Sequence, residues 1–285
     1  MENPHARAAF GKMEWVLCPV CAVEPVPFAV DHQGFRLCRC PSCRLECASP
    51  RPAFEELHSK VYNEDYFPHS RPAQEVDPLR RYQFDRQLRT LERFSRGNKR
   101  LLDVGCGEGS FLGSAQDRGW DVTGTDIRIS REARALSCPL LEGTLGEIAL
   151  EPGSFDVIRF NHVLEHTQNP LEELARARTL LAENGTIFVS VPNLAGISAR
   201  IKSFQSRLHL KSHRWRHYAA IHHLWYFTPA SLKTLVEKAG LQTLLWETPV
   251  LKKPGRGPVG DLVYRWTLEK PRCASILDLY CTPRK

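Results

Sequence analysis

The segment from Leu101 to Leu112, LLDVGCGEGSFL, constrains the fold of this chain more than any other part of it. An apolar run that ends in an acid is followed by closely spaced glycines, which is typical of a strand that turns into a helix. The glycines let the backbone approach a ligand. Their pattern is Gly-x-Gly-x-Gly with Ser110 next, whereas a dinucleotide fingerprint requires Gly-x-Gly-x-x-Gly. The segment therefore predicts a nucleotide-like ligand that is not a dinucleotide.

Two acids narrow the choice of ligand. Asp103 closes the first strand, where it would repel a diphosphate and attract an ammonium group. Asp126 lies 21 residues after Gly105 at the end of the next apolar run, where a carboxylate can accept hydrogen bonds from both hydroxyls of a ribose. A ligand with an amino-acid end and a nucleoside end satisfies both, and S-adenosylmethionine is such a ligand. The alternative is a glycine turn that serves only tight packing.

The rest of the chain predicts an α/β fold. From Lys99 onward, short apolar runs alternate with helical patterns such as FLGSAQDRG and REARAL, and ASILDLYCT reads as a last strand. This alternation predicts a doubly wound, mostly parallel sheet with helices on both faces. Before it, apolar residues at helical spacing predict an amphipathic helix ended by Gly97. We expect a small module in residues 1–60, a linker and leading helix in 61–98, and the cofactor domain in 99–285.

The first module is rich in cysteine. Six of the ten cysteines fall between Cys18 and Cys47, and four form two Cys-x-x-Cys knuckles 18 residues apart. Two facing knuckles give a closed tetrahedral site suited to structural Zn²⁺, and metal would supply folding energy that so few apolar side chains cannot. Free cysteines or disulfides are the alternative, and Cys38 and Cys47 are competing ligands. We predict a zinc-ribbon-like module whose ligands are Cys18, Cys21, Cys40 and Cys43.

The motifs from Lys99 to Thr282 resemble the class I S-adenosylmethionine-dependent methyltransferases. The resemblance implies a seven-stranded Rossmann-like sheet. It also implies that Asp103 and the following turn hold the methionine end of the cofactor, that Asp126 holds the ribose, and that Ile127 lies against adenine. Residues 143–145 would line the adenine pocket. The cofactor residues implied in this way are Asp103, Gly105, Cys106, Gly107, Gly109, Asp126, Ile127 and Asn161.

A His-x-x-Glu-His motif follows the run FDVIRF. If a helical turn starts there, His162, Glu165 and His166 share one face, at the sheet edge where ligands bind. A zinc-protease helix is excluded because the motif follows a strand within a methyltransferase pattern. Ubiquinone-pathway O-methyltransferases look similar here, with Glu-x-x-Glu-His associated with a divalent metal near the acceptor. In this chain we predict His166 as a general base, with His162 near the methionine part of the cofactor. An architectural role for the motif is the alternative.

The positive charge of the chain is local. The formal net charge is +7, and the stretch from Asn184 to Val236 holds seven Lys and Arg residues and no acidic residue. Within it, an amphipathic helix with apolar residues from Ile197 to Leu208 precedes HHLWYFT, in which His223 aligns best with zinc-module methyltransferases. We predict an acceptor lid that suits an anionic small molecule, such as a nucleotide-linked sugar or a lipid carrier. A solvated helix face and a membrane-surface helix are the alternatives.

The N-terminal knuckles, YNEDYF and the helix after them resemble a bacterial subgroup that carries a zinc module and acts on sugars and other metabolites. An RNA methyltransferase with a zinc ribbon is a competing reading, but the local charge disfavours a nucleic-acid partner, and the Asn/Asp-Pro-Pro-Tyr box is missing. A non-catalytic cofactor-binding module is the other alternative. No apolar run is long enough to span a bilayer, and no signal peptide is evident, so we expect a cytoplasmic enzyme.

Overall fold

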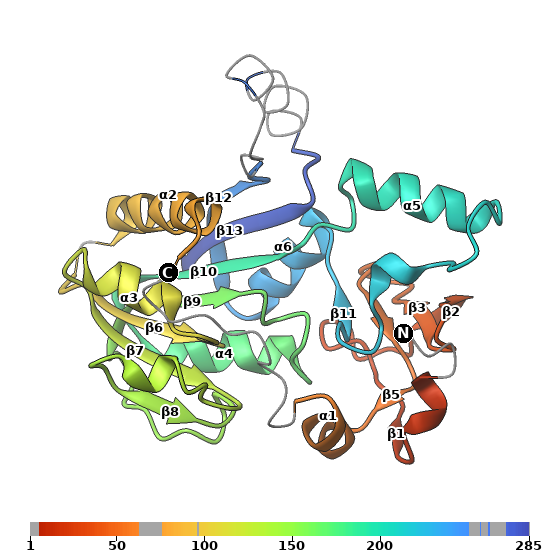
Figure 1. The fold of residues 1–285 in the computed structure, drawn as a ribbon, viewed down its shortest axis with the longest axis horizontal. Helices are drawn as coiled ribbons and strands as arrows, with labels where there is room; N and C mark the ends of the chain where they lie inside the picture. Colours follow the sequence, from red (N-terminus) through yellow and green to blue (C-terminus); the bar gives the residue numbers. More distant parts are fainter. Residues whose placement is uncertain are drawn as a thin grey trace.

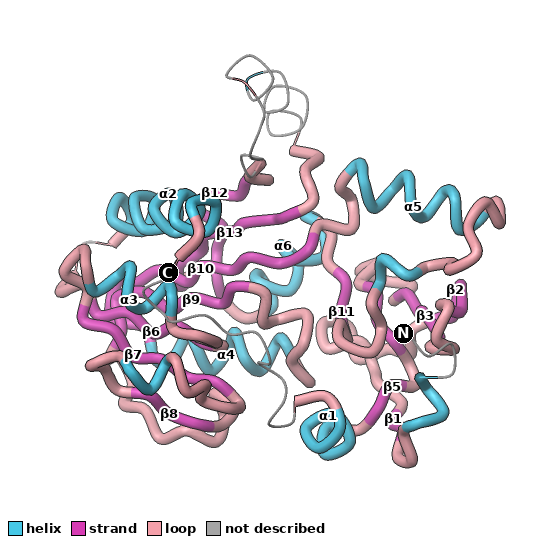
Figure 2. The backbone as a smooth tube through the Cα atoms, viewed as in Figure 1, coloured by secondary structure: helices cyan, strands magenta, loops and turns pink. Residues whose placement is uncertain are grey.

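The computed structural model describes residues 6–62, 76–95, 97–250 and 272–284, together with Gly257 and Leu262 (Figure 1). These residues form a large sheet flanked by helices and a smaller part, rich in short strands, that contains the beginning of the chain. Figure 2 separates the helices from the strands and shows helices on both sides of the large sheet.

The large sheet has seven strands in the order β12-β13-β10-β9-β6-β7-β8. β13 runs antiparallel to β10 and β12, and the other neighbouring strands pair in parallel. The expected doubly wound, mostly parallel sheet is therefore confirmed. Its strands are β6 (Arg100–Val104), β7 (Asp121–Asp126), β8 (Leu140–Glu142), β9 (Phe155–Asn161), β10 (Leu181–Pro192), β12 (Leu241–Glu247) and β13 (Ile276–Pro283).

Helices cover both faces of this sheet. Leu88 of α2 and Leu112 of α3 share a buried cluster with Phe188, whereas Leu174 of α4 packs in a second cluster with Ile158. In the part of the chain that the structure describes, no helix has the length and apolar character needed to cross a membrane. The helices are α1 (Phe54–Lys60), α2 (Pro78–Phe94), α3 (Ser110–Gln116), α4 (Pro170–Leu180), α5 (Ile197–Arg207) and α6 (Pro229–Lys238).

Three of these helices begin with the same local chemistry. Asp77, Asn169 and Thr228 each accept hydrogen bonds from backbone N–H groups of the first turn, and each is followed by a proline. These donors would otherwise lack partners, and proline has no N–H to satisfy there. For α6, the cap is Thr228 and the helix begins at Pro229.

The segment REARAL forms less helix than its pattern indicates. It contains only a 3-10 turn, Ala133–Ala135. The hydroxyl of Ser130 donates to the carbonyl of Gly107 at 3.0 Å and accepts a hydrogen bond from the N–H of Ala133 at 3.1 Å. The chain is thereby held against the glycine turn, and the local packing overrides helix propensity.

The smaller part combines strands from the N-terminal region with one strand, β11, that lies much later in the sequence. A four-stranded sheet has the order β11-β4-β3-β2, and β1 pairs with β5. Trp225 and Tyr226 of β11 lie opposite Cys47 and Glu46 of β4, so a segment that follows α5 completes the N-terminal sheet. The elements are the 3-10 turn Ala6–Ala9, β1 (Met13–Glu14), β2 (Val26–Val30), β3 (Arg36–Arg39), β4 (Glu46–Ala48), β5 (Arg51–Pro52) and β11 (Trp225–Tyr226); a 3-10 turn, Arg216–Tyr218, precedes β11.

Candidate cofactor and acceptor site

Two cavities meet at the carboxyl ends of β6, β7 and β9. One has a volume of about 570 Å³, and the other has a volume of about 640 Å³. Gly105, Gly107 and His162 line both of them. Because parallel strands end at the same edge, the sheet brings the glycine turn and the His-x-x-Glu-His motif together as the sequence predicts.

The glycine turn needs glycine for two different reasons. Gly105 has φ +70°, and a Cβ there would lie 2.4 Å from a methyl carbon of Val163. Gly107 has φ +56°, and a Cβ there would meet no atom within 4 Å. Gly105 therefore makes room for the side chain of Val163, whereas the space beside the Cα of Gly107 is open.

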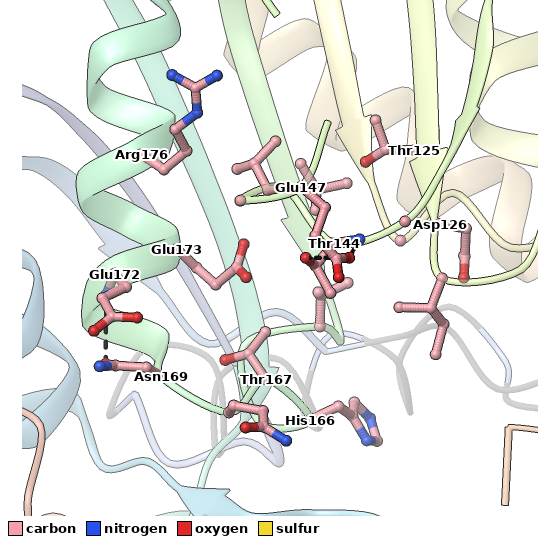
Figure 3. Close-up of a pocket in the computed structure, with 18 of the residues that line it drawn as sticks. Thr125, Asp126, Thr144, Glu147, His166, Thr167, Asn169, Glu172, Glu173 and Arg176 are labelled. Carbon is pink, nitrogen blue, oxygen red and sulfur yellow. Dashed lines mark hydrogen bonds between the residues drawn. The ribbon is translucent and has the colours of Figure 1, made fainter. Parts of the chain in front are cut away.

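Asp126 lies at the end of β7 beside this turn. Its Oδ2 accepts a hydrogen bond from the N–H of Gly107 at 2.9 Å, and its Oδ1 accepts one from the N–H of Arg128 at 3.3 Å. Burial raises the pKa of Asp126 to about 6, and the nearby Asp103 adds to the rise. Asp126 lines the first of the two cavities, which Figure 3 shows, and Thr144 and Leu145 line it too.

Asp103 is fully buried and does not stand alone. Its Oδ1 accepts a hydrogen bond from Nη1 of Arg159 at 2.7 Å, while its Oδ2 has no hydrogen-bond partner among the described residues. Burial raises the pKa of this carboxyl, and Arg159 opposes the rise. The sequence interpretation missed Arg159. Its signal was a charged residue in the middle of the apolar run FDVIRF, because a buried cation requires a partner.

Neighbouring elements hold Arg159 in place. Gln87 of α2 accepts hydrogen bonds from Nε and Nη2 of Arg159 at 3.2 and 3.1 Å. The guanidinium carbon lies 3.7 Å from the ring centre of Phe111 in α3. Gln87 also donates to Oδ1 of Asn161, which lines the second cavity with Asp103 and Cys106.

The His-x-x-Glu-His motif does not form the expected helical turn. His162 has a left-handed backbone with φ 57°, so the three side chains are not arranged on a helix face. His162 Nδ1 nevertheless lies 3.3 Å from Oε1 of the fully buried Glu165. Burial raises the pKa of Glu165, but the hydrogen bond with His162 and the nearby histidines outweigh it, so the pKa is lowered overall.

His223 joins this group from a distant part of the chain. Ligand-type atoms of Glu165, His166 and His223 all lie within 4.8 Å of one another, and the rings of the two histidines are 4.9 Å apart. Oε2 of Glu165 has no hydrogen-bond partner among the described residues. Burial, followed by the charge of His166, lowers the pKa of His223 to about 4. His162 lies outside this close group, so the trio that the structure assembles differs from the one in the sequence motif.

Similarity to known proteins decides the family. Residues 79–245, more than half of the chain, match a family model described as a methyltransferase domain. This chain belongs to that family. The seven-stranded, mostly parallel sheet agrees with this family.

The relatives agree with this assignment. The methyltransferase is 30% identical over 132 residues to the ubiquinone biosynthesis O-methyltransferase of Saccharophagus degradans, a match that covers 43% of this chain and 53% of the relative. A second enzyme of that name, from Marinobacter nauticus, is 30% identical over 151 residues, covering 49% and 60%. The matches thus span only a little over half the length of these relatives.

Solved structures share the fold. The 1,6-didemethyltoxoflavin-N1-methyltransferase of Burkholderia thailandensis superposes with a TM-score of 0.56 and 16% identity, covering 91% of this chain and all of that one. A putative S-adenosylmethionine-dependent methyltransferase from Listeria monocytogenes has a TM-score of 0.52 and 16% identity, covering 73% and 100%.

The four knuckle cysteines of the methyltransferase lie together. The sulfurs of Cys18, Cys21, Cys40 and Cys43 are all within 4.8 Å of one another. A tetrahedral zinc site with bonds of about 2.3 Å places its sulfurs about 3.8 Å apart, so this arrangement fits Zn²⁺. Both knuckles form the same kind of turn. The residue that follows each knuckle has a left-handed backbone, and its N–H donates to the carbonyl oxygen of the first cysteine in that knuckle.

The competing cysteines are used differently. Cys38 and Cys47 lie opposite each other on β3 and β4 and are buried. The thiol of Cys38 donates to the carbonyl of Ser49 at 3.4 Å. Neither belongs to the close group of four sulfurs.

Replacing Arg159 with Met should strongly destabilise the methyltransferase, because it leaves Asp103 buried without its cation. We expect the free energy of unfolding to fall by about 3–5 kcal/mol, measured by urea denaturation. Arg134→Gln breaks an exposed pair with Glu142 and should cost no more than about 1 kcal/mol. Adding Asp103→Asn to Arg159→Met should recover part of the loss. Equal effects of the Arg159 and Arg134 changes would contradict this account.

Proposed function

We propose that the enzyme transfers the methyl group of S-adenosylmethionine to a small-molecule acceptor. The observation that carries the proposal is the meeting of the two cavities at Gly105, Gly107 and His162, with Asp126 on one side and Asp103 on the other. A cofactor with a nucleoside end and an amino-acid end fits such a divided site. The bound cofactor supplies an electrophilic methyl group with a neutral leaving group, so the protein acts mainly by alignment.

The residues of each cavity suggest which end of the cofactor it holds. Asp126, with Ile127 and Leu145 nearby, supports binding of the adenosine end in the first cavity. The unpartnered Oδ2 of Asp103 and the open space beside Gly107 support binding of the methionine end in the second. Cys106, Gly109 and Asn161 shape this second end: Cys106 and Asn161 line the cavity, and Gly109 packs tightly against Ala133.

We assign the general base to His166. Its Nδ1 lies 2.7 Å from the carbonyl oxygen of His222, which can only accept a hydrogen bond. Nδ1 therefore carries the proton in the neutral ring, and Nε2 keeps a free lone pair for an acceptor proton. Glu165 supports the protonated ring that results, because its lowered pKa keeps it ionised. His223, with a pKa near 4, stays neutral beside it at neutral pH.

The charge of the acceptor stays a prediction from the sequence. Lys202 and His223 line a small cavity of about 140 Å³, which offers one cation for an anionic group. The first cavity is lined instead by Glu147, Glu172 and Glu173, with Arg176 beyond them (Figure 3). Burial, followed by these neighbouring carboxylates, raises the pKa of Glu173 to about 7. The small cavity with Lys202 therefore supports an anionic acceptor better than the first cavity does.

Asp126→Ala should weaken cofactor binding at least tenfold, because hydrogen bonds to a charged group contribute about 1.5–3 kcal/mol. Calorimetric titration with S-adenosylhomocysteine measures this, and Asp121→Ala, at the exposed start of the same strand, is the matched control. Wild-type affinity should also fall as pH drops below about 6, because the carboxylate form accepts from the ribose and Asp126 is protonated below its pKa. An unchanged affinity of Asp126→Ala would show that the ribose binds elsewhere.

Methyl-labelled cofactor should label a small-molecule or lipid fraction of a lysate when incubated with the purified enzyme. His166→Ala should slow labelling by about 10²–10⁴-fold while leaving cofactor affinity unchanged, because it removes only the base. His213→Ala, an exposed histidine, is the control and should be fully active. Label confined to RNA would overturn the choice of acceptor class, and full activity of His166→Ala would overturn the choice of base.

We further propose that the four-cysteine cluster holds structural zinc. The purified enzyme should contain about one zinc ion per chain by mass spectrometry, and Cys40→Ser should lose it. Cys40→Ser should also lower the melting temperature, because metal binding contributes to the folding of this module. Cys138→Ser, a half-buried cysteine far along the chain, should keep the metal. Full zinc content in Cys40→Ser would contradict the assignment.

A further inference from the structure

Helix α5 carries its apolar side chains on the outside of the molecule. Ile197, Ile201, Phe204 and Leu208 are 46%, 52%, 61% and 53% exposed. Their spacing of three and four residues places them along one side of the helix. A surface helix normally buries such a side, so α5 has the reverse of the usual orientation.

Small polar residues face the protein instead. Ser206 is buried, and its hydroxyl accepts a hydrogen bond from the N–H of Trp215 at 3.0 Å. The hydroxyl of Ser203 lies 2.9 Å from Nε2 of His217. These contacts fix which side of α5 faces inward. Figure 1 shows α5 along the outer edge of the molecule.

The charges around this apolar side have one sign. Arg200 and Arg207 lie four residues before and three residues after Phe204, so both flank the apolar side. They are exposed, as are Lys202 and Lys211, and none of the four has an ion-pair partner within the described ranges. From Asn184 to Val236 the sequence contains no acidic residue that could pair with them.

We propose that α5 binds the surface of a membrane containing anionic lipids, with Ile201 and Phe204 inserted below the headgroups. An apolar side flanked by Lys and Arg is what such a surface binds: the side chains enter the boundary of the acyl chains while the cations pair with headgroups. The uniformly positive flank favours a negatively charged bilayer over a second copy of this positively charged chain, which it would repel.

The position of α5 gives this contact a consequence for the site. Ala199 and Lys202 of α5 line the small cavity that His223 also lines. A docked α5 would therefore hold the His166–His223 end of the site close to the lipid surface. The proposal itself concerns binding alone and stands whether or not the proposed methyl transfer is correct.

Vesicle flotation with the full chain tests the proposal. Vesicles of phosphatidylcholine and phosphatidylglycerol at 7:3 should carry the protein upward at low salt, and pure phosphatidylcholine vesicles should carry much less. Ile201→Ser with Phe204→Ser should weaken binding at least tenfold. Arg200→Gln with Arg207→Gln should weaken it by about tenfold or more, since each cation near an anionic surface contributes roughly fivefold.

Matched control variants distinguish binding through α5 from nonspecific adsorption of the protein to vesicles. Leu244→Ser removes an exposed apolar side chain on β12, and Lys238→Gln removes an exposed cation at the end of α6; both should bind like the wild type. No flotation with anionic vesicles, or undiminished flotation of the Ile201/Phe204 variant, would overturn the proposal. So would a dimer in light scattering that the Ile201/Phe204 change dissociates, because the apolar side would then face a second chain.

Discussion

The arrangement of this enzyme depends on one buried ion pair. A carboxylate without access to water stays ionised only beside a cation, and Asp103 has Arg159 for this purpose. Arg159 is in turn held by Gln87 from α2 and by the ring of Phe111 from α3. The pair thus joins two helices to the two central strands that carry the glycine turn and the His-x-x-Glu-His motif.

Local sequence patterns were sufficient to predict much of the fold. The alternation of apolar runs and helices, the Gly-x-Gly-x-Gly turn, and a capping residue followed by proline each act over a few neighbouring residues, so they can be read from the sequence. The same holds for the four knuckle cysteines, whose sulfurs the structure brings together. Asp126 and Gly107, which we propose as cofactor residues, also lie where a strand-turn-helix unit must place them.

What the sequence could not show depends on packing between distant segments. The partner of Asp103 is 56 residues away. His162 takes a left-handed backbone, so the helical spacing of its motif did not describe the site. The periodicity of α5 revealed an apolar side but not its orientation, because the contacts of Ser203 and Ser206 decide that, and they involve His217 and Trp215.

Because β11 pairs with β4, the N-terminal strands and the large sheet are not two independent units that follow each other along the chain. His223 lies two residues before β11, and the backbone N–H groups of Leu224 and Trp225 donate to the carbonyl oxygen of Glu165. The edge of the N-terminal sheet and the wall of the candidate acceptor site are therefore the same stretch of chain. A shortened enzyme that begins after the N-terminal strands would leave that stretch without its neighbour.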